Sequence, residues 1–149
     1  MEKQQKLVAA LENGSVIDHI PTDKLFTVAQ LLQLELCTEP VLIGNNLESQ
    51  VMGKKGIIKI AGKFFSEAEI SKLAVLCPNM RLTVIRNYEV AEKREIGLPE
   101  KLTNIVKCAN PVCITSNEPM KTVFYRKDIE TLKCRYCGKE QKLKDIKLK

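Results

Sequence analysis

The sequence is poor in the residues and motifs that mark the common enzyme active sites. Its 149 residues include no tryptophan and a single histidine, His19, and aromatic residues make up only 5 %. One histidine cannot build a histidine-rich metal centre. The sequence also lacks a phosphate loop ending in GK[ST], a nucleophile elbow of the GxSxG type and an HExxH motif. The sequence therefore lacks the usual signatures of three enzyme classes: P-loop nucleotide hydrolases, α/β-hydrolases and zinc proteases.

Long hydrophobic runs are absent as well. No apolar stretch approaches the roughly 18 residues needed to span a bilayer. The first fourteen residues, MEKQQKLVAALENG, are charged and polar and lack the apolar core of a signal peptide. We therefore expect a cytoplasmic protein without a membrane partner. In such a reducing compartment the six cysteines are expected as thiols or metal ligands before disulfides.

Charge divides the chain into two parts. Residues 1–100 hold 12 Lys and Arg against 13 Asp and Glu, and residues 101–149 hold 12 against 5, a balance of +7. The segment between them turns at Gly97 and Pro99. We therefore expect two domains, 1–99 and 100–149. The basic second part favours an acidic partner, protein or nucleic acid; a solvated lysine-rich tail explains the charge equally well.

The first 99 residues alternate between strand and helix patterns. Asn13-Gly14 predicts the turn of a hairpin over residues 6–20, and a capping box at Ser66 and Glu69 predicts a helix start. The expected elements are strand 16–20, helix 23–37 capped by Thr22, strand 40–44, a polar loop 45–55, strand 56–64, helix 66–77 and strand 80–90. The order β-α-β-β-α-β predicts an α+β, ferredoxin-like domain with two helices on one face of an antiparallel sheet. Its first strand should lie between the third and the last.

Four cysteines in the C-terminal part carry the strongest chemical signal. Cys108 and Cys113 have four residues between them in CANPVC, and Cys134 and Cys137 have two between them in CRYC. Two such thiolate pairs can bind one metal ion tetrahedrally, and four sulfur ligands favour zinc. With no ligand position left for water, the zinc should be structural, in a small all-β, zinc-ribbon-like domain that metal binding stabilises by on the order of 10 kcal/mol. The rival readings are a redox CxxC, which calls for a βαβ context, and an iron site.

The remaining two cysteines do not belong to this pattern. Cys37 and Cys77 stand at the ends of the two expected helices, on their apolar faces. Free cysteines in such positions are usually core residues. We expect both to be buried thiols.

The histidine lies in VIDHIP, residues 16–21, beside Asp18. Neighbouring side chains of a strand point to opposite faces, so this pattern argues against a catalytic pair of Asp18 and His19. The predicted sheet instead brings Asp18, His19, Lys59 and Tyr88 to one site, with Lys55 on the face of Lys59 and Lys93 just past the last strand. Such a group suits an anionic ligand. The alternative, that each lysine is simply solvated, remains open on the residues alone.

Several stretches together resemble one family. KLVAALENGSVIDHIP, MGKKGIIKI, RNYEV and LPEKLTNIVKCANPVC…LKCRYC are similar to the regulatory chain of aspartate carbamoyltransferase of bacteria and archaea, over essentially the whole sequence. The resemblance implies a subunit without an active site of its own. Its N-terminal domain would bind nucleotide effectors, with CTP as inhibitor, often with UTP, and ATP as activator in some members. Its zinc domain would dock on the catalytic chain, which makes carbamoyl-aspartate on the way to pyrimidines.

The resemblance also implies an assembly and a binding site. Regulatory chains would pair through their N-terminal domains, and three such dimers would bridge two catalytic trimers, with Asn110 as a candidate contact to the catalytic chain. Lys93 and His19 would bind phosphate oxygens, Asp18 and Lys59 ribose hydroxyls, and the backbone around Leu11 and Tyr88 a base edge. The implied nucleotide site consists of Val8, Ala10, Leu11, Val16, Asp18, His19, Lys55, Lys59, Tyr88, Val90 and Lys93.

Two other functions fit the same architecture. A ferredoxin-like domain followed by a basic zinc module is also found in nucleic-acid-binding proteins. RNA-recognition sheets, however, carry exposed aromatic residues on their central strands, and VIDHI and GIIKI have none. The other alternative is a small-molecule sensor that controls a different enzyme.

Overall fold

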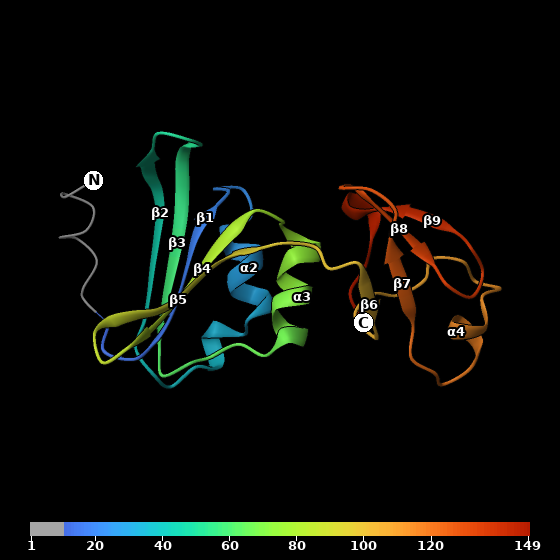
Figure 1. Cartoon of the computed structure of the whole chain (residues 1–149), viewed down its shortest axis with the longest axis horizontal. Coiled ribbons are helices and arrows are strands. Elements are labelled where there is room, and N and C mark those ends of the chain that lie inside the picture. Colours follow the sequence, from blue (N-terminus) through green and yellow to red (C-terminus); the bar gives the residue numbers. More distant parts are fainter. Residues whose placement is uncertain (1–10) are drawn as a thin grey trace. The chain divides into compact units, whose positions relative to one another are not determined.

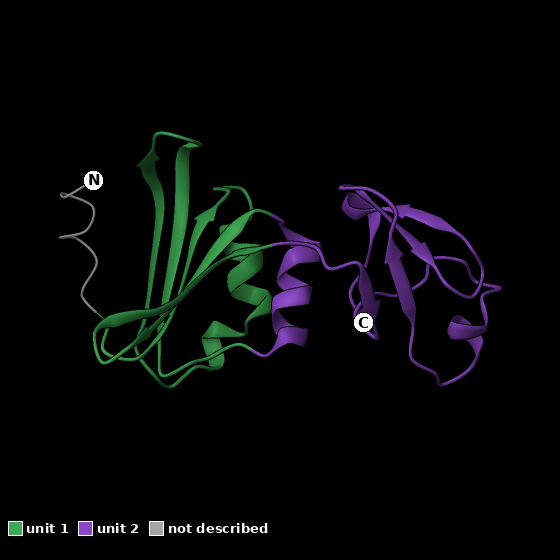
Figure 2. Cartoon of the chain, viewed as in Figure 1, with its two compact units in different colours: residues 1–65, 79–96 green, residues 66–78, 97–149 purple. Residues whose placement is uncertain are grey.

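The computed structural model describes residues 11–149, which form two compact units (Figure 2). One unit takes the chain up to Phe65 together with Asn79–Ile96, and the other takes Ser66–Pro78 together with Gly97–Lys149. This division assigns the helix that begins after Ser66 to the second unit. The boundary between residues 99 and 100 therefore stays a prediction.

A five-stranded antiparallel sheet forms the first unit (Figure 1). Its elements are β1 Gly14–Ile20, α2 Leu25–Leu31, the 3₁₀ turn η1 Leu34–Leu36, β2 Val41–Ser49, β3 Gly53–Ala61, β4 Met80–Arg86 and β5 Glu89–Ile96. The strand order is β2-β3-β1-β4-β5, so β1 pairs with both β3 and β4. The predicted central position of the first strand is confirmed, and so is the α+β class.

One face of this sheet is the core. Ile17 on β1, Ile58 on β3 and Leu82 on β4 are buried side by side, since Ile17 pairs with both of the others. Helix α2 covers this face with Leu25 and Val28, which are fully buried. The contact is so close that a Cβ on Gly56 would lie 2.8 Å from Leu25 Cδ1. Burial of each such aliphatic side chain contributes about 1.5–3 kcal/mol, and strand alternation leaves the polar side chains to the opposite face.

The first helix is shorter than expected. It begins after Lys24, without a side-chain cap from Thr22, and the chain leaves helical geometry at Gln33, whose φ is 54°. The turn η1 then accounts for Leu34–Leu36. The apolar spacing from Leu25 to Leu36 was compatible with one long helix, but a left-handed residue ends an α-helix regardless of the pattern beyond it.

Two stretches expected to be irregular are strands. Residues 45–49 continue β2 and residues 53–55 belong to β3, with Glu48 opposite Lys54 in the register. Residues 91–96, which lie beyond the last expected strand, belong to β5. Backbone pairing holds both segments in the sheet although their side chains are mostly exposed, and charged side chains are common on edge strands.

The last predicted strand is interrupted by a turn. Asn87 and Tyr88 both have positive φ angles, 53° and 66°. Two consecutive residues of this kind form the tight turn that suits the twist of a β-hairpin, so β4 ends at Arg86 and β5 begins at Glu89. The hairpin predicted over residues 6–20 has most of its first arm outside the described residues.

The second unit contains a four-stranded antiparallel sheet with the order β6-β7-β8-β9 (Figure 1). Its elements are α3 Glu67–Leu76, β6 Lys101–Thr103, α4 Ile114–Asn117, β7 Val123–Arg126, β8 Thr131–Cys134, β9 Glu140–Lys142 and the 3₁₀ turn η2 Leu143–Asp145. The small sheet buries Leu102, Phe124 and Leu132, and the expected small all-β domain is confirmed. The capping box of α3 is also confirmed, since Ser66 Oγ accepts from Glu69 N and Glu69 Oε1 accepts from Ser66 N. Over residues 11–149 no helix has the length and apolarity needed to cross a membrane.

Candidate functional site

Four cysteines of the second unit converge on one point. The Sγ atoms of Cys108, Cys113, Cys134 and Cys137 all lie within 4.8 Å of one another. The distance from Cys108 to Cys137 is 3.5 Å and from Cys113 to Cys134 3.8 Å. Four sulfurs at the usual Zn–S length of about 2.3 Å in a tetrahedron lie about 3.8 Å apart. The cluster therefore fits a tetrahedral ion of this size and leaves no ligand position for water.

The local fold points backbone and side-chain donors at these sulfurs. Burial raises the pKa of Cys108 and Cys134, and backbone N–H groups act against it: that of Asn110 on Cys108 and those of Tyr136 and Cys137 on Cys134. Cys113 Sγ lies 3.1 Å from Thr115 Oγ1. Donors of this kind stabilise thiolates over thiols, as a metal centre requires.

The cysteine thiols of the cluster differ in pKa. Burial raises the pKa of Cys108 to about 12 and also raises the pKa of Cys134. Burial acts in the same direction on Cys137, but hydrogen bonds from the Lys139 N–H and the Asn110 side chain outweigh it, and the pKa falls to about 7. A metal ion has to displace the protons that remain near neutral pH, so metal binding must weaken as the pH falls.

The two cysteines outside the cluster differ from each other. Cys77 is buried, with 7 % of its surface exposed, as expected of a core thiol. Cys37 is only half-buried, and its Sγ lies 3.6 Å from the carbonyl oxygen of Glu39. The prediction of a buried Cys37 is wrong because the helix that would have carried it ends earlier.

A second candidate site lies on the sheet face opposite α2. The register places Lys59 of β3, Val16 of β1, Thr83 of β4 and Lys93 of β5 in one row. Three strand spacings separate the two lysines, a distance of about 14 Å. One phosphate group cannot contact both, so an elongated ligand would bind them at different points. Burial lowers the pKa of Lys59 from its ordinary value.

The next row along the strands carries opposite charges. Asp18 of β1 faces Arg81 of β4, which faces Glu95 of β5. Lys55, on the same face of β3 as Lys59, donates to Asp18 Oδ2 at 3.1 Å, and its side chain is only 11 % exposed. This ion pair fixes the Asp18 carboxylate at the border of the lysine row.

Asp18 and His19 do not point apart, contrary to the expectation from strand alternation. His19 has a φ of 59°, and the pairing of β1 with β3 is shifted between Ile17 and Ile20. This bulge turns the imidazole back toward its neighbour, so that His19 Nδ1 lies 3.5 Å from Asp18 Oδ1 and His19 N donates to the same oxygen at 2.6 Å. His19 Nδ1 is buried and finds no hydrogen-bond partner among the described residues, and such unpaired buried atoms are rare in native proteins.

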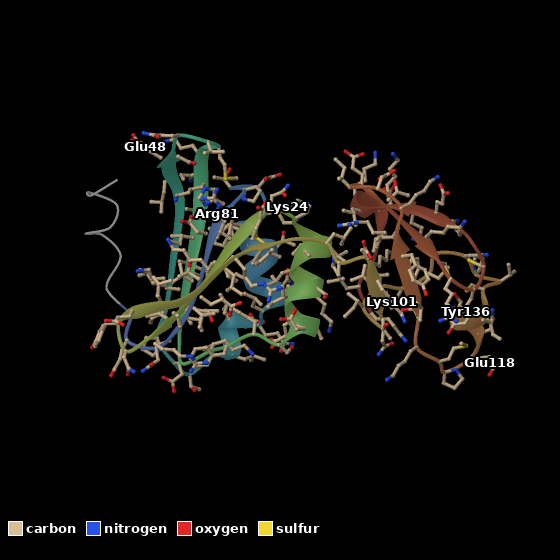
Figure 3. All side chains as sticks on the ribbon, in the orientation of Figure 1. Lys24, Glu48, Arg81, Lys101, Glu118 and Tyr136 are labelled. Atoms are coloured by element: carbon tan, nitrogen blue, oxygen red, sulfur yellow. The ribbon has the colours of Figure 1, made fainter. Side chains whose placement is uncertain are left out.

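A cavity of about 430 Å³ opens beside this bulge, a size typical of small-molecule sites. Arg81, labelled in Figure 3, and Glu95 line it but were not among the residues expected from the sequence. Strand alternation was the signal that could have found Arg81, since it lies two residues before Thr83. The cavity is lined by Asp18, His19, Arg81, Leu82, Thr83, Lys93, Arg94 and Glu95.

The other expected residues lie around this face or outside the described chain. Val90 pairs with Ile85 next to the lysine row. Tyr88, in the β4–β5 turn, is 67 % exposed, and its backbone N–H donates to the carbonyl oxygen of Glu12 at 2.9 Å, which brings the turn beside half-buried Leu11. Val8 and Ala10 lie outside the described residues, and their place in the site stays a prediction.

Comparison with known proteins covers nearly the whole chain. The family model for the aspartate carbamoyltransferase regulatory chain, allosteric domain, matches residues 6–97, and the model for its metal binding domain matches residues 100–147. A protein of Phocaeicola vulgatus named aspartate carbamoyltransferase regulatory chain is 58 % identical over 148 residues, 98 % of this chain and 96 % of the relative. The protein of the same name from Bacteroides fragilis is 58 % identical over 146 residues, 97 % and 95 % of the two chains. In Pyrococcus abyssi it is 39 % identical over 143 residues, 93 % and 94 %.

An α+β unit with a charged open face and a unit whose small β-sheet is joined to four clustered cysteines define a two-part protein with a metal-binding domain. The chain belongs to the family of aspartate carbamoyltransferase regulatory chains. The resemblance drawn from the sequence is thereby confirmed, with an allosteric domain followed by a metal-binding domain.

Proposed function

We propose that this chain is a non-catalytic regulatory subunit that binds nucleotide effectors of the CTP and ATP type on the open face of its N-terminal sheet, and so controls the catalytic chain's step toward pyrimidines. The observation that carries the proposal is the strand register, which gathers Lys59, Thr83 and Lys93 in one row beside the Asp18–Lys55 pair. One cation at each end of the row suits an elongated ligand that accepts charge-assisted hydrogen bonds at two separate points.

The parts of a nucleotide would divide along this strip. Lys93 and His19 border the cavity beside the bulge. A phosphate oxygen bound there would give His19 Nδ1 the hydrogen-bond partner that it lacks. Asp18 and Lys59 would bind the ribose hydroxyls, and the backbone at Leu11 and Tyr88 would bind the base edge. The proposed site is the full expected set, including Val8, Ala10, Val16, Lys55 and Val90.

The metal of the second domain is proposed to be one structural zinc ion per chain, held by Cys108, Cys113, Cys134 and Cys137. The four sulfurs fit a tetrahedral ion, and thiolate ligands favour zinc over magnesium or calcium. The domain, taken as residues 100–149, would dock on catalytic trimers. Val112 and Ile114, exposed by 82 % and 52 % on the first cysteine loop and the helix after it, support a contact surface next to Asn110.

Pairing of two regulatory chains is proposed to use the N-terminal unit. β2 is an edge strand of the sheet and exposes Leu42 and Ile43 by 39 % and 42 %. An unpaired apolar edge is a ready site for pairing with another chain, and a hollow of about 540 Å³ lined by Phe26, Ala29 and Val41 lies beside it. Sedimentation of the isolated chain at twice its 16.8 kDa mass is expected, and a monomer at micromolar concentration would contradict this pairing.

The cytoplasm is the proposed compartment. All six cysteines have free thiols in the described structure, and Cys108, Cys113, Cys134 and Cys137 can hold a metal only in the reduced state. A reducing compartment keeps them available.

Calorimetric titration of CTP into the metal-loaded protein, with and without magnesium, tests the proposed function. We expect saturable binding near one site per chain, because each chain has one N-terminal sheet with this charged open face. Folded, metal-loaded protein that binds no CTP would contradict the effector assignment. An RNA titration run in parallel tests the main alternative, and we expect no binding, because β1 and β3 carry no Phe, Tyr or Trp for base stacking.

A further inference from the structure

The cysteine cluster has a hydrogen-bonding environment that includes two side chains. Cys113 is 2 % exposed, and its Sγ lies 3.1 Å from Thr115 Oγ1. A metal-bound thiolate carries no proton, so in the loaded protein the hydroxyl must be the donor and the sulfur the acceptor. The contact then becomes a charge-assisted hydrogen bond, roughly twice as strong as a neutral one.

A second side chain reaches the opposite pair of cysteines. The Asn110 carboxamide oxygen accepts from the backbone N–H of Val112 at 3.1 Å. This bond fixes which end of the amide is the acceptor and leaves its NH₂ group as the donor toward Cys137, whose pKa the Asn110 side chain lowers. Asn110, from the loop of the first cysteine pair, is thereby oriented to donate to a sulfur of the second pair.

The loop that carries both donors is held in place by other contacts. Ser116 Oγ donates to the carbonyl oxygen of Asn110 at 2.9 Å. Asn117 Nδ2 donates to the carbonyl oxygens of Pro111 and Cys113 at 3.0 and 2.9 Å. Neither Ser116 nor Asn117 has a described bond to a cluster sulfur. Their support of the loop can therefore be tested separately from the hydrogen bonds that Thr115 and Asn110 donate to sulfur.

We propose that Thr115 and Asn110 are positioning residues of the metal centre, whose side chains donate hydrogen bonds to Cys113 and Cys137 and thereby tighten metal binding. Four thiolates around a divalent ion leave an excess of two negative charges. One donor on each cysteine pair spreads that charge over the surrounding protein, as outer-shell partners do in other metal sites. This inference rests on the proposal that the site holds zinc.

The test compares Thr115→Val, which removes the hydroxyl at nearly constant shape, with Thr115→Ser, which keeps it. We expect Thr115→Val to lower zinc affinity about 10- to 100-fold in competition with a chelator, and Thr115→Ser to stay near the parent protein. Asn110→Asp, which replaces the donor by a negative charge, should lose at least as much.

A spectroscopic readout separates positioning from mere support of the fold. In the cobalt-loaded full-length protein, loss of a hydrogen bond to a thiolate should shift the sulfur-to-cobalt charge-transfer band to lower energy. Asn117→Ala, which removes a loop contact but no sulfur donor, is the matched control and should leave the band in place. An unchanged band and affinity in Thr115→Val and Asn110→Asp, or an equal shift in Asn117→Ala, would overturn the inference. A parent protein that binds neither zinc nor cobalt would overturn the zinc proposal itself.

Discussion

Replacing Cys113 by serine is expected to release the metal, unfold residues 101–149 and abolish assembly with catalytic trimers. Cys113 is buried and its Sγ lies 3.8 Å from that of Cys134, so the substitution removes one of four ligands from the centre of the cluster. The strands around it are only three or four residues long. Metal binding on the order of 10 kcal/mol is comparable to the whole stability of a typical domain.

Three measurements check this expectation in order. Metal analysis should find less than one ion per chain, circular dichroism should show loss of the β structure of the second unit, and gel filtration should show no complex with catalytic trimers. Cys37→Ser is the matched control, because Cys37 lies outside the cluster and is half-buried. Metal-free Cys113→Ser protein that still assembles would contradict a structural role of the metal. A parent protein that holds metal but does not assemble would contradict only the proposal that the domain docks on the catalytic chain.

The sequence predicted the parts of the fold that depend on buried side chains. The apolar residues of β1, β3 and β4 alternate with the period of a strand, and the core that they form has this same face inward. The capping box at Ser66 was predictable because both partners are local in sequence. The cysteine cluster was predictable for the same reason, since each pair sits on one short loop.

The missed strands were held by forces that side-chain patterns do not report. Residues 45–49 and 91–96 lie in the sheet through backbone hydrogen bonds, and both belong to edge strands on which only Ile96 is buried. Without a buried face no alternation is imposed on the sequence. The end of α2 was missed because one left-handed residue, Gln33, interrupts an otherwise continuous apolar spacing.

The candidate effector site shows the same division. The row of Lys59, Val16, Thr83 and Lys93 depends on the strand register and on β5, which was not expected as a strand; only the gathering of Asp18, His19 and Lys59 at the central strands followed from the β-α-β-β-α-β pattern. The approach of His19 to Asp18 did not, because it depends on a bulge and a positive φ in the middle of β1. Arg81 was overlooked although strand alternation puts it on the face of Thr83, because its charged partners in the site, Asp18 and Glu95, come from other strands.

Lys93→Ala is expected to weaken CTP binding by about 10- to 100-fold, the equivalent of losing one or two charge-assisted hydrogen bonds. Lys93 is exposed on β5 and lines the cavity beside His19, where the proposed phosphate contacts lie. The substitution removes a cation from an edge strand without opening the core, so folding, metal content and assembly should be unchanged.

Comparing the binding of CTP with that of cytidine shows which part of the nucleotide Lys93 contacts. If Lys93 binds phosphate, its loss should spare the binding of cytidine, which has the base and ribose but no phosphate. Lys54→Ala is the matched control: Lys54 is an exposed lysine on β3, next to Lys55 but on the other face of the strand, and its loss should change neither affinity. Equal weakening of CTP and cytidine would place Lys93 at the nucleoside instead. Unchanged CTP affinity would remove Lys93 from the site and leave the lysine row on this face as solvated surface.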